Sequence, residues 1–579
     1  MIDLKYTEIL SQNKQLGLTL KSEQFKVSVL SNIITTQFNE IFEYALRSQN
    51  INAIVNTGDY DNIIQDSEKY NSSNVVIVFW EASNIIEGLQ YRANLMSADE
   101  IEILLSKTYA EIDFVLQNLK DTAQIIFNTF SSVVFNYKNI ADNNYDFICK
   151  NLNDYLLGKK QQNLVCVDID KIIAHNSIAN SIDFRFFYSS KALYTISFFK
   201  HYATHIKALI LSNVGKAKKV LVFDCDNTLW KGILGEDGFD KIEMSSQTKS
   251  GVLYEEVQSM AVELAKSGIL IGLCSKNNAG DVENVLNSHP DIVLKNEYIT
   301  IKKVNWIDKV TNIKNIAKEL NVGLDSIVFV DDSEFELGHV KEFLPEVTTF
   351  RVPQNLYEYP AALRDKLFLF YSNKKTAEDK KRTDFYNQEQ LRSAEQSTFS
   401  NIEDYLKSLQ LQITVYKNPL SSIPRLSQLS QKTNQFNLTT RRYTEAQITN
   451  FLESNNYLTF AFSTADKFGD TGIVGLCIMQ IKNKIAAIDT FLMSCRVIGR
   501  NIEIAFVNYL INYLKEIGIE KVESSFIKSL KNAQVEDFYT KMGFQNIHNA
   551  EKNRDYELSI NSYTNKSINY IKINDGREN

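Results

Sequence analysis

The sequence predicts an α/β protein of three domains. The chain has 579 residues, which is too many for a single hydrophobic core. Short apolar runs alternate with helical patterns through its first two thirds, as expected for parallel sheets covered by helices. The last third has strand patterns that end in a glycine-bearing turn and a further helix. We expect domains over 1–210, 211–370 and 395–570, and a polar linker helix over 371–394.

The first domain shows alternating strand and helix patterns. Val, Ile and Phe runs predict strands at 25–30, 74–80 and 163–168, and helical periodicity predicts helices at 37–49 and from about 97 to 137. This order favours a parallel sheet with helices on both faces.

The middle domain opens with an apolar strand, Val220–Phe223, that is followed directly by Asp224-Cys-Asp226. Side chains alternate along a strand, so we expect both carboxylates on one side and Cys225 turned the other way. Two acids at the carboxyl end of a strand suit a divalent cation and a phosphoryl group. One can attack phosphorus or bind metal while the other moves a proton, because their surroundings can separate their pKa values.

Three later segments supply partners for these acids. A second apolar strand ends at Ser275, whose hydroxyl can hydrogen-bond a phosphoryl oxygen, and Lys309 starts a helical pattern with an ammonium suited to neutralising charge. A third strand ends in Asp331 and Asp332, which can complete a Mg²⁺ site. Each residue alone is typical of a surface acid or a helix cap; their order on three strand ends predicts a site.

The D-x-D-x-T spacing and the three later segments resemble the haloacid-dehalogenase (HAD) signature. The resemblance implies a role for each residue: Asp224 as nucleophile and metal ligand; Asp226 as acid/base and metal ligand; Thr228, Ser275 and Asn277 as substrate contacts; Lys309 as catalytic cation; Asp331 and Asp332 as metal ligands. Ser275 lies only 47 positions after Thr228, and Lys309 lies 34 positions after Ser275. We therefore expect a minimal flap and no cap domain, which leaves a cleft open enough for a substrate carried on a protein.

The last domain resembles the GNAT acetyltransferase fold. Arg496 and Gly499 match the R-x-x-G-x-G/A loop that binds coenzyme A in that fold, whereas Asn501 stands where a third small residue is usual. A strand that breaks at such a turn and opens a helix exposes backbone N–H groups to a pyrophosphate. The resemblance implies that Arg496 and Gly499 contact a coenzyme A or phosphopantetheine group.

The whole chain resembles the FkbH-like family. The resemblance is carried by Asp224–Gly238, Cys274–Asn277, Asn305–Lys309, Thr433–Tyr443 and Ser494–Arg500. It implies a Mg²⁺-dependent enzyme of polyketide and related pathways. Such an enzyme removes phosphate from an acyl phosphate, for example 1,3-bisphosphoglycerate, and loads the acyl group onto an acyl carrier protein thiol.

Two further expectations come from the same resemblance. The paired arginines Arg441 and Arg442 would bind phosphate of a coenzyme or carrier arm, or would form a solvated turn. The first domain is similar to the SGNH-hydrolase fold, but Leu30-Ser31-Asn32 replaces the Gly-Asp-Ser of its catalytic block, and Asp183-Phe-Arg185 stands near where an Asp and a His would be needed. We therefore expect this domain to be a non-catalytic scaffold or docking surface.

The cysteine pattern and the net charge limit the classes of protein to which this chain can belong. The six cysteines include no C-x-x-C pair, which favours reduced thiols and a cytoplasmic protein. Cys495, beside Arg496 at a turn that opens a helix, is a candidate nucleophile for a thioester route as well as a packed apolar residue; Cys225 and Cys274 are expected to be packed. A formal charge of −7 argues against nucleic-acid binding as a function, and we expect no membrane-spanning helix.

The sequence leaves four functions open. Carrier-protein loading from an acyl phosphate is the leading hypothesis. The alternatives are a small-molecule phosphatase with an inert GNAT-like domain, a docking scaffold without activity, and a coenzyme A-dependent acyltransferase that uses the Arg496–Asn501 loop.

Overall fold

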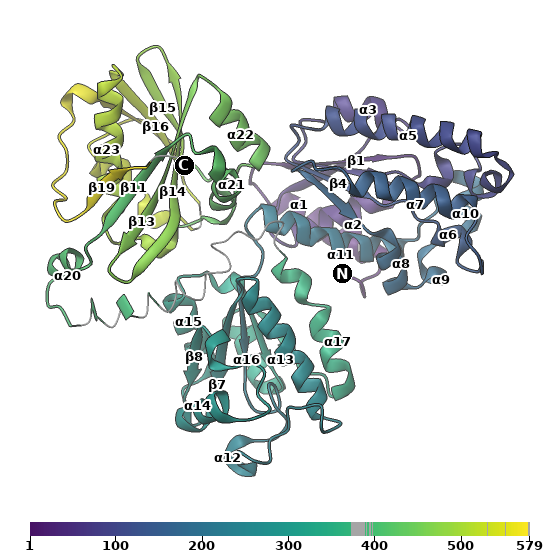
Figure 1. Cartoon of the computed structure of the whole chain (residues 1–579), viewed down its shortest axis with the longest axis horizontal. Helices are drawn as coiled ribbons and strands as arrows, with labels where there is room; N and C mark the ends of the chain where they lie inside the picture. Colours follow the sequence, from purple (N-terminus) through teal and green to yellow (C-terminus); the bar gives the residue numbers. More distant parts are fainter. Residues whose placement is uncertain are drawn as a thin grey trace. The chain divides into compact units, whose positions relative to one another are not determined.

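The computed structural model describes most of the chain as two compact units. The described residues are 1–371, 388, 391–392, 395–396, 398–529, 531–550 and 552–576. One unit holds residues 1–210 with 443–450, and the other holds 211–442 with 451–579. The linker helix expected over 371–394 falls almost entirely outside the described residues. Figure 1 labels the elements along the chain.

The first unit is built on a parallel sheet of five strands, in the order β2-β1-β3-β4-β5 within residues 1–210. Its strands are β1 (Phe25–Ser31), β2 (Ala53–Thr57), β3 (Val75–Phe79), β4 (Gln124–Asn128) and β5 (Leu164–Val167). Its helices are α1 (Tyr6–Thr19), α2 (Thr36–Arg47), α3 (Ile63–Lys69), α4 (Leu89–Arg92), α5 (Ala98–Asn118), α6 (Val133–Asn136), α7 (Asn144–Leu157), α8 (Ile169–Asn176), α9 (Ile178–Ser181), α10 (Phe184–Ser190) and α11 (Ile196–Asn213).

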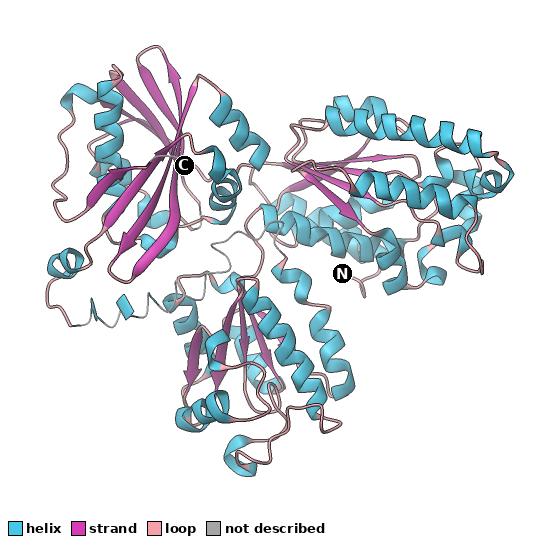
Figure 2. Cartoon of the chain, viewed as in Figure 1, coloured by secondary structure: helices cyan, strands magenta, loops and turns pink. Residues whose placement is uncertain are grey.

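Helices cover both faces of this sheet (Figure 2). Side chains of α5 and α7 pack with Val76, Val78 and Phe127 on one face. On the other face, α2 and α11 meet the sheet through aromatic contacts such as that between Phe79 and Tyr202. Burial of both faces explains why the strands read as continuous apolar runs.

One expected helix of this unit is wrong in its extent. The helix predicted from about 97 to 137 ends at Asn118, and the chain then forms β4 at the buried run Gln124–Asn128. The run Ile125-Ile-Phe127 is β-branched and aromatic, so it fits a pleated, fully buried strand better than a helix. The strand β2 was not predicted, because only one end of its short segment is buried.

The second unit contains two separate sheets. The first is parallel, in the order β10-β9-β6-β7-β8. Its strands are β6 (Val220–Phe223), β7 (Leu270–Ser275), β8 (Ile301–Val304), β9 (Ile327–Asp331) and β10 (Thr348–Arg351). Its helices are α12 (Leu234–Asp237), α13 (Gly251–Lys266), α14 (Ala279–Ser288), α15 (Lys309–Glu319), α16 (Glu334–Phe343) and α17 (Tyr359–Arg364).

Strand alternation divides this domain into two apolar layers. Leu221 and Phe223 of β6 join the side chains of α13, α14 and α17 in one buried cluster. Val220 and Val222 join those of α15 and α16 in the other. The carboxyl ends of β6 and β9 are therefore held between packed layers, which fixes the residues that follow them.

The other sheet of the second unit is mixed and larger. In the described part of the chain its order is β17-β18-β16-β15-β14-β13-β11-β19, and β12 pairs with β15. Its strands are β11 (Gln412–Lys417), β12 (Phe436–Asn437), β13 (Tyr457–Asp466), β14 (Gly469–Lys482), β15 (Ile485–Met493), β16 (Lys521–Ile527), β17 (Gln545–Asn549), β18 (Asn553–Ser559) and β19 (Lys572–Asp575). Its helices are α20 (Ile402–Ser408), α21 (Ile423–Lys432), α23 (Ile502–Glu516) and α24 (Phe538–Lys541). The helix α22 (Glu445–Glu453) lies mostly in residues 443–450, which belong to the first unit.

The fold class expected from the sequence, a multidomain α/β protein, is confirmed by these three sheets. Among the described residues, every helix is too short or too polar to cross a lipid bilayer.

Candidate active site

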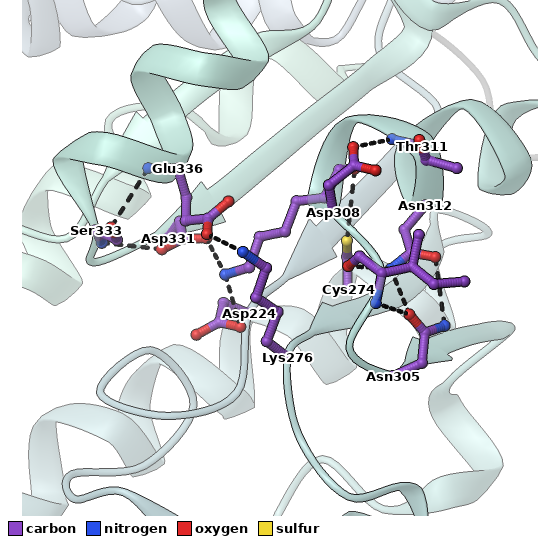
Figure 3. Close-up of polar contacts among 12 residues, drawn as sticks. Asp224, Cys274, Lys276, Asn305, Asp308, Thr311, Asn312, Asp331, Ser333 and Glu336 are labelled. Atoms are coloured by element: carbon purple, nitrogen blue, oxygen red, sulfur yellow. Dashed lines mark hydrogen bonds and ion pairs between the residues drawn. The ribbon is translucent and has the colours of Figure 1, made fainter.

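Three carboxylates converge at the carboxyl ends of two neighbouring strands. Strands β6 and β9 pair with Phe223 opposite Val330, and the Asp224 amide donates to the Val330 carbonyl at 2.9 Å. This register places Asp224 beside Asp331. Asp224, Asp331 and Asp332 each offer an oxygen within 4.8 Å of the others. Figure 3 shows Asp224 and Asp331 side by side. The structure therefore brings Asp224 and Asp331 together at one end of the sheet.

A buried lysine joins two of these acids. Lys309 is the first residue of α15, and the preceding Asp308 caps that helix by accepting from the Thr311 amide at 2.8 Å. The Lys309 ammonium lies 3.0 Å from Asp224 Oδ1 and 2.5 Å from Asp331 Oδ2, and its side chain is only 5% exposed. The helix start and its cap thus aim one cation between two acids.

The charges in this cluster shift one another. Burial opposes the charge on Lys309, but the carboxylates of Asp224 and Asp331 outweigh burial and raise the lysine pKa. Burial, together with the negative charge of Asp224, raises the pKa of Asp331 to about 7. Burial also raises the pKa of Asp332. Buried carboxylates that lie close together repel one another, and a nearby positive charge reduces this repulsion; Lys309 supplies part of that charge.

Asp226 lies outside the three-acid group, although it was also predicted as a metal ligand. Its Oδ1 accepts from Trp230 Nε1 and from the Leu234 amide, both at 3.0 Å, and its Oδ2 accepts from Asn277 Nδ2 at 2.9 Å. Burial raises its pKa despite these hydrogen bonds. An oriented carboxyl with a raised pKa is suited to giving and taking protons.

Two hydroxyls border the acids. Thr228 is fully buried, and its Oγ1 has no hydrogen-bond partner. Ser275, at the end of β7, is also buried and lies beside the Cys225 thiol. A buried hydroxyl without a partner is costly unless a ligand satisfies it, so Thr228 fits the phosphate contact that the sequence predicts.

The three-acid group fits Mg²⁺. Magnesium prefers oxygen ligands and is commonly held by one or two carboxylates together with phosphate oxygens. Asp224, Asp331 and Asp332 supply the carboxylates, and the unsatisfied Thr228 hydroxyl marks where a phosphoryl oxygen would be received. The residues present therefore suit a metal ion and a phosphoryl group together.

No cap domain is inserted around this site within residues 228–309, all of which are described. Between Thr228 and Ser275 there are only the short helix α12 and the core helix α13, and between Ser275 and Lys309 only α14, a single 3₁₀ turn and β8. The expected minimal flap is present at residues 229–244, where Lys231 and Glu243 pair across the loop.

Sequence reasoning missed two side chains near the acids. Trp230, fully buried, orients Asp226 through its indole N–H. Lys276 forms an ion pair with Glu336 at 2.6 Å (Figure 3). Trp230 lies in the segment Asp224–Gly238 and Lys276 in Cys274–Asn277, both of which carry the family resemblance. The resemblance therefore points to these segments, but the sequence spacing assigns no function to either side chain.

Cys495 and Arg496 lie elsewhere. Both line a cavity with Lys219 and Ser326, which directly precede β6 and β9. Since the acids follow the opposite ends of these strands, a strand of four to five residues separates the two places, roughly 13–17 Å at 3.3 Å per residue. The structure therefore does not bring Cys495 to the three acids.

Cys225 and Cys274 are packed as expected. Both are fully buried in the two apolar layers of the domain. Burial raises the pKa of each thiol far above its usual range. Neither is suited to attack as a thiolate.

The paired arginines have partners inside the chain. Arg441 forms an ion pair with Asp489, and Arg442 donates to the Gln431 carbonyl and to Asn434 Oδ1. Burial lowers the pKa of Arg442 to about 10. Neither residue lines the cavity beside Cys495. Their contacts with Asp489 and Gln431 tie the loop to β15 and α21.

Gly499 lies in the turn between β15 and α23. Its φ of 85° is in the left-handed region, and Asn501 at the helix N-cap has φ 60°. Glycine meets the first of these requirements without strain. The turn is the one the sequence predicts, and the Asn501 side chain donates to the Tyr570 hydroxyl at 2.6 Å.

The string Thr433–Tyr443 fills the space where two strands diverge. Strands β15 and β16 pair from Ile485 and Lys521 as far as Ile488 and Ser524, where the pairing ends. Beyond that point β12 pairs with β15, the Leu438 amide donates to Phe491, and the Ile527 amide of β16 donates to the Leu438 carbonyl. The chain itself therefore supplies hydrogen-bond partners to both strands at this opening.

The first unit has no serine triad at the expected position. Ser31 is buried at the end of β1, and its Oγ accepts from the Ile33 amide. Asp183 pairs with Arg185, two residues away. Ser31 and Asp183 therefore both have local partners within residues 1–210.

Comparisons with known proteins support the fold. The chain is similar to the N-terminal part of protein BF1531 from Bacteroides fragilis, which contains a phosphatase domain complexed with Mg. The identity is 23% and the TM-score 0.57, over 64% of this chain and 100% of that one. At this identity the likeness shows the fold of the matched part.

Weaker likenesses involve acetyltransferases. The ribosomal-protein-S18-alanine N-acetyltransferase from Escherichia coli matches at 15% identity and TM-score 0.21, over 26% of this chain and 94% of that one. Spermidine N-acetyltransferase from Vibrio cholerae, in complex with CoA and spermine, matches at 11% identity and TM-score 0.21, over 26% and 98%. No protein-family model matches the chain, and no curated protein matches it.

Proposed function

We propose that the protein is a Mg²⁺-dependent enzyme that binds an acyl phosphate at Asp224 and directs its acyl group to the thiol of an acyl carrier protein, with release of phosphate. The observation that carries the proposal is the buried group of Asp224, Lys309 and Asp331 beside the unsatisfied hydroxyl of Thr228. Such a group suits a phosphoryl substrate, because it combines metal ligands, a cation and a hydrogen-bond donor.

Each residue has a separate task in this proposal. Asp224, Asp331 and Asp332 would hold Mg²⁺, which when bound offsets the negative charge of the phosphoryl group. Lys309 adds a fixed ammonium at the same place, and Thr228 donates its hydroxyl to a phosphoryl oxygen. Asp226, held by Trp230 and Asn277, takes the proton of the incoming thiol or water.

Bond cleavage decides between transfer and hydrolysis. To form a thioester, the carrier sulfur attacks the acyl carbon, the bond from that carbon to the bridging oxygen breaks, and inorganic phosphate leaves with that oxygen. If Asp224 instead attacks phosphorus, the bond from phosphorus to oxygen breaks and the acyl group leaves as a free carboxylate. Loading therefore requires Asp224 to hold the phosphoryl group in place rather than accept it.

The surroundings of the site support a protein-bound partner. The described residues 228–309 contain no cap domain, and Trp306, Ile307 and Phe335 are 77%, 50% and 76% exposed. Trp306 and Ile307 lie just ahead of Lys309, and Phe335 lies in the first turn of α16 after Asp332. Large apolar side chains exposed at the edge of an open site are typical of protein docking surfaces.

An isotope experiment tests the proposal. The full-length protein, Mg²⁺ and 1,3-bisphosphoglycerate are incubated in ¹⁸O-labelled water with a holo carrier protein, and products are measured by intact-mass and phosphate mass spectrometry. We expect an acylated carrier and unlabelled phosphate. Labelled phosphate without acylated carrier would overturn the proposal.

A matched pair of variants connects this reaction to the site. Asp224→Asn should lower phosphate release by on the order of 10³-fold, since it removes a charge that fixes the metal and the phosphoryl group. Asp240→Asn makes the same change at an exposed position of the flap and should leave the rate unchanged. Equal rates for both variants would place the reaction elsewhere.

A phosphatase acting on free small molecules is the second candidate. The same acids support it, and a site without a cap domain would admit water as well as a thiol. Turnover of free phosphomonoesters without a carrier, with ¹⁸O entering the phosphate, would favour it. Acyl transfer from coenzyme A is less well supported, because residues 436–438 occupy the opening between β15 and β16; titration with acetyl-CoA tests it directly.

A further inference from the structure

A cavity of about 220 Å³ lies in the second unit, away from the acidic site. Its walls come from the residues just ahead of β6 and β9, from the end of α21 and from the turn after β15. This volume is far larger than the about 15 Å³ that admits one water molecule. The cavity can therefore hold a small organic ligand.

The walls of this cavity are strongly basic. Five cationic side chains line it: Lys219, Arg425, Lys432, Arg496 and Lys531. Among the described lining residues there is no aspartate or glutamate, although the whole chain has a net charge of −7. Concentrating cations in one hollow of an acidic protein creates a local positive potential that attracts anions.

Two further lysines and one carboxylate lie close to the cavity. Lys216 and Lys218 lie in the segment leading to Lys219. Burial first, and the charge of Lys531 in addition, lower the pKa of both, that of Lys218 to about 8. Asp325 offsets part of the charge through its ion pair with Lys531 at 2.7 Å. Arg425 also has partners within the chain, since it donates to the Ile473 carbonyl and to Gln428 Oε1.

The rest of the lining is polar rather than apolar. Asn434, Gln435 and Thr433 offer amide and hydroxyl groups, and the Cys495 thiol is half-buried with its Sγ 3.7 Å from the Asn321 carbonyl oxygen. Guanidinium and ammonium groups around one space are suited to a phosphate, whose oxygens accept several charge-assisted hydrogen bonds at once. The amides and hydroxyls suit an organic group attached to that phosphate.

We propose that this cavity is a second binding site that takes an organic phosphate, with the phosphate among the five cations and the organic group against the amide side chains. The proposal stands on the cavity and its charges and does not depend on the function proposed for the acidic site. The ligand chemistry has two sources, a free small phosphate ester or the phosphopantetheine arm of a carrier.

The position of Cys495 gives a direct assay in the full-length protein. Among the six cysteines, Cys495 and Cys166 are half-buried and the other four are buried. Alkylation by iodoacetamide, quantified for each peptide by mass spectrometry, therefore reports on Cys495 with Cys166 as internal reference. Glycerol 3-phosphate and 4′-phosphopantetheine are the two probes, and pantetheine is the neutral control.

We expect at least one phosphate probe to slow alkylation of Cys495 without slowing that of Cys166, and pantetheine to have no effect. Protection by glycerol 3-phosphate would identify a small phosphate ester as sufficient. Protection by 4′-phosphopantetheine alone would identify the carrier arm. Isothermal titration with the same probes covers the case of an unreactive thiol, and the absence of both protection and heat at millimolar probe would overturn the proposal.

Two variants assign the binding to the cavity. Lys432→Gln should weaken the probe at least about tenfold, since a hydrogen bond to a charged group contributes that much. Lys318→Gln removes the same charge from an exposed position of α15 outside the cavity and should leave binding unchanged. Asp224→Asn should also leave it unchanged, so a failure of the proposed enzyme activity remains distinguishable from a failure of this site. Equal affinity in Lys432→Gln and the unmodified protein would refute the assignment.

Discussion

Replacing Lys309 with methionine tests how the acidic site is held together. The substitution keeps a long unbranched side chain and removes only the ammonium that lies 3.0 Å from Asp224 and 2.5 Å from Asp331. All three side chains are at most 9% exposed, so solvent cannot replace the lost cation. Two acids would then face each other with no opposite charge between them.

The size of the effect follows from these distances. At an effective dielectric constant of about 20, charges 3.0 Å apart attract by about 5 kcal/mol. The cost of burying the ammonium offsets part of this attraction, and removing one member of a buried ion pair costs about 3–5 kcal/mol. For a domain of this size that corresponds to a fall in Tm on the order of 10 °C.

Metal and pH should change this loss in a defined direction. Mg²⁺ should recover part of it in Lys309→Met, because a cation again lies among the acids. The loss should be larger at pH 8 than at pH 5, since protonation of one acid removes the repulsion and the pKa of Asp331 is already raised to about 7.

Tryptophan fluorescence measures this transition. A Trp80→Phe background removes the tryptophan of the first unit. It leaves the buried Trp230 and the exposed Trp306, both in the site domain, as reporters. Lys303→Met is the matched control: its ion pair with Glu319 is 22% and 51% exposed and should contribute at most about 1 kcal/mol. If Lys309→Met and Lys303→Met unfold at the same temperature at pH 8, the central ion pair does not hold the site together.

Three further changes have defined outcomes. Thr228→Val should lower the rate of phosphate release at least about tenfold. Its free energy of unfolding in urea should be unchanged or higher by about 1 kcal/mol, because the buried Thr228 hydroxyl has no partner among the described residues. A lower free energy of unfolding would contradict this. Burial raises the pKa of Glu81, which accepts from the Tyr194 hydroxyl, to about 7 from an ordinary value near 4.3. Its stabilising contribution is thus complete below about pH 4 and lost as pH rises to 7, so Glu81→Gln should stabilise the first unit by about 3 kcal/mol at pH 8 and much less at pH 4, as measured by urea unfolding at both values. Asp466→Asn should cost about 3–5 kcal/mol in the same assay, since it breaks the buried bidentate pair with Arg392; a loss below 1 kcal/mol would contradict that.

The acidic site was largely predictable because strand ends encode it. Alternation along β6 and the acids after β9 depend only on local pattern, and parallel strands in one sheet end at the same edge. The sequence pattern alone therefore predicts that Asp224 and Asp331 are neighbours. It could not show that the side chain of Asp226 would turn to Trp230 and Asn277, because those contacts depend on the path of the flap.

The second sheet of this unit was less predictable for a physical reason. Arg441 and Arg442 carry the charges of a phosphate site, but their partners come from α21 and β15, which pattern alone does not bring beside them. In the same way, Cys495 lies near a charged turn, but its distance from the acids depends on how the two sheets pack. Local pattern identifies a reactive type of residue and leaves its neighbours undetermined.

The separation between the acids and Cys495 constrains the chemistry of loading. The cavity lies ahead of Ile327 and the acids follow at Asp331, so the rigid strand β9 holds the two places apart. An acyl phosphate held at Asp224 cannot pass its acyl group to Cys495 without leaving the site or a rearrangement of the core. A thiol on a mobile arm has no such restriction, because no cap domain within residues 228–309 stands between it and the acids. The proposed loading reaction therefore needs no enzyme thioester at Cys495, and Cys495→Ser should leave the acylation of the carrier intact.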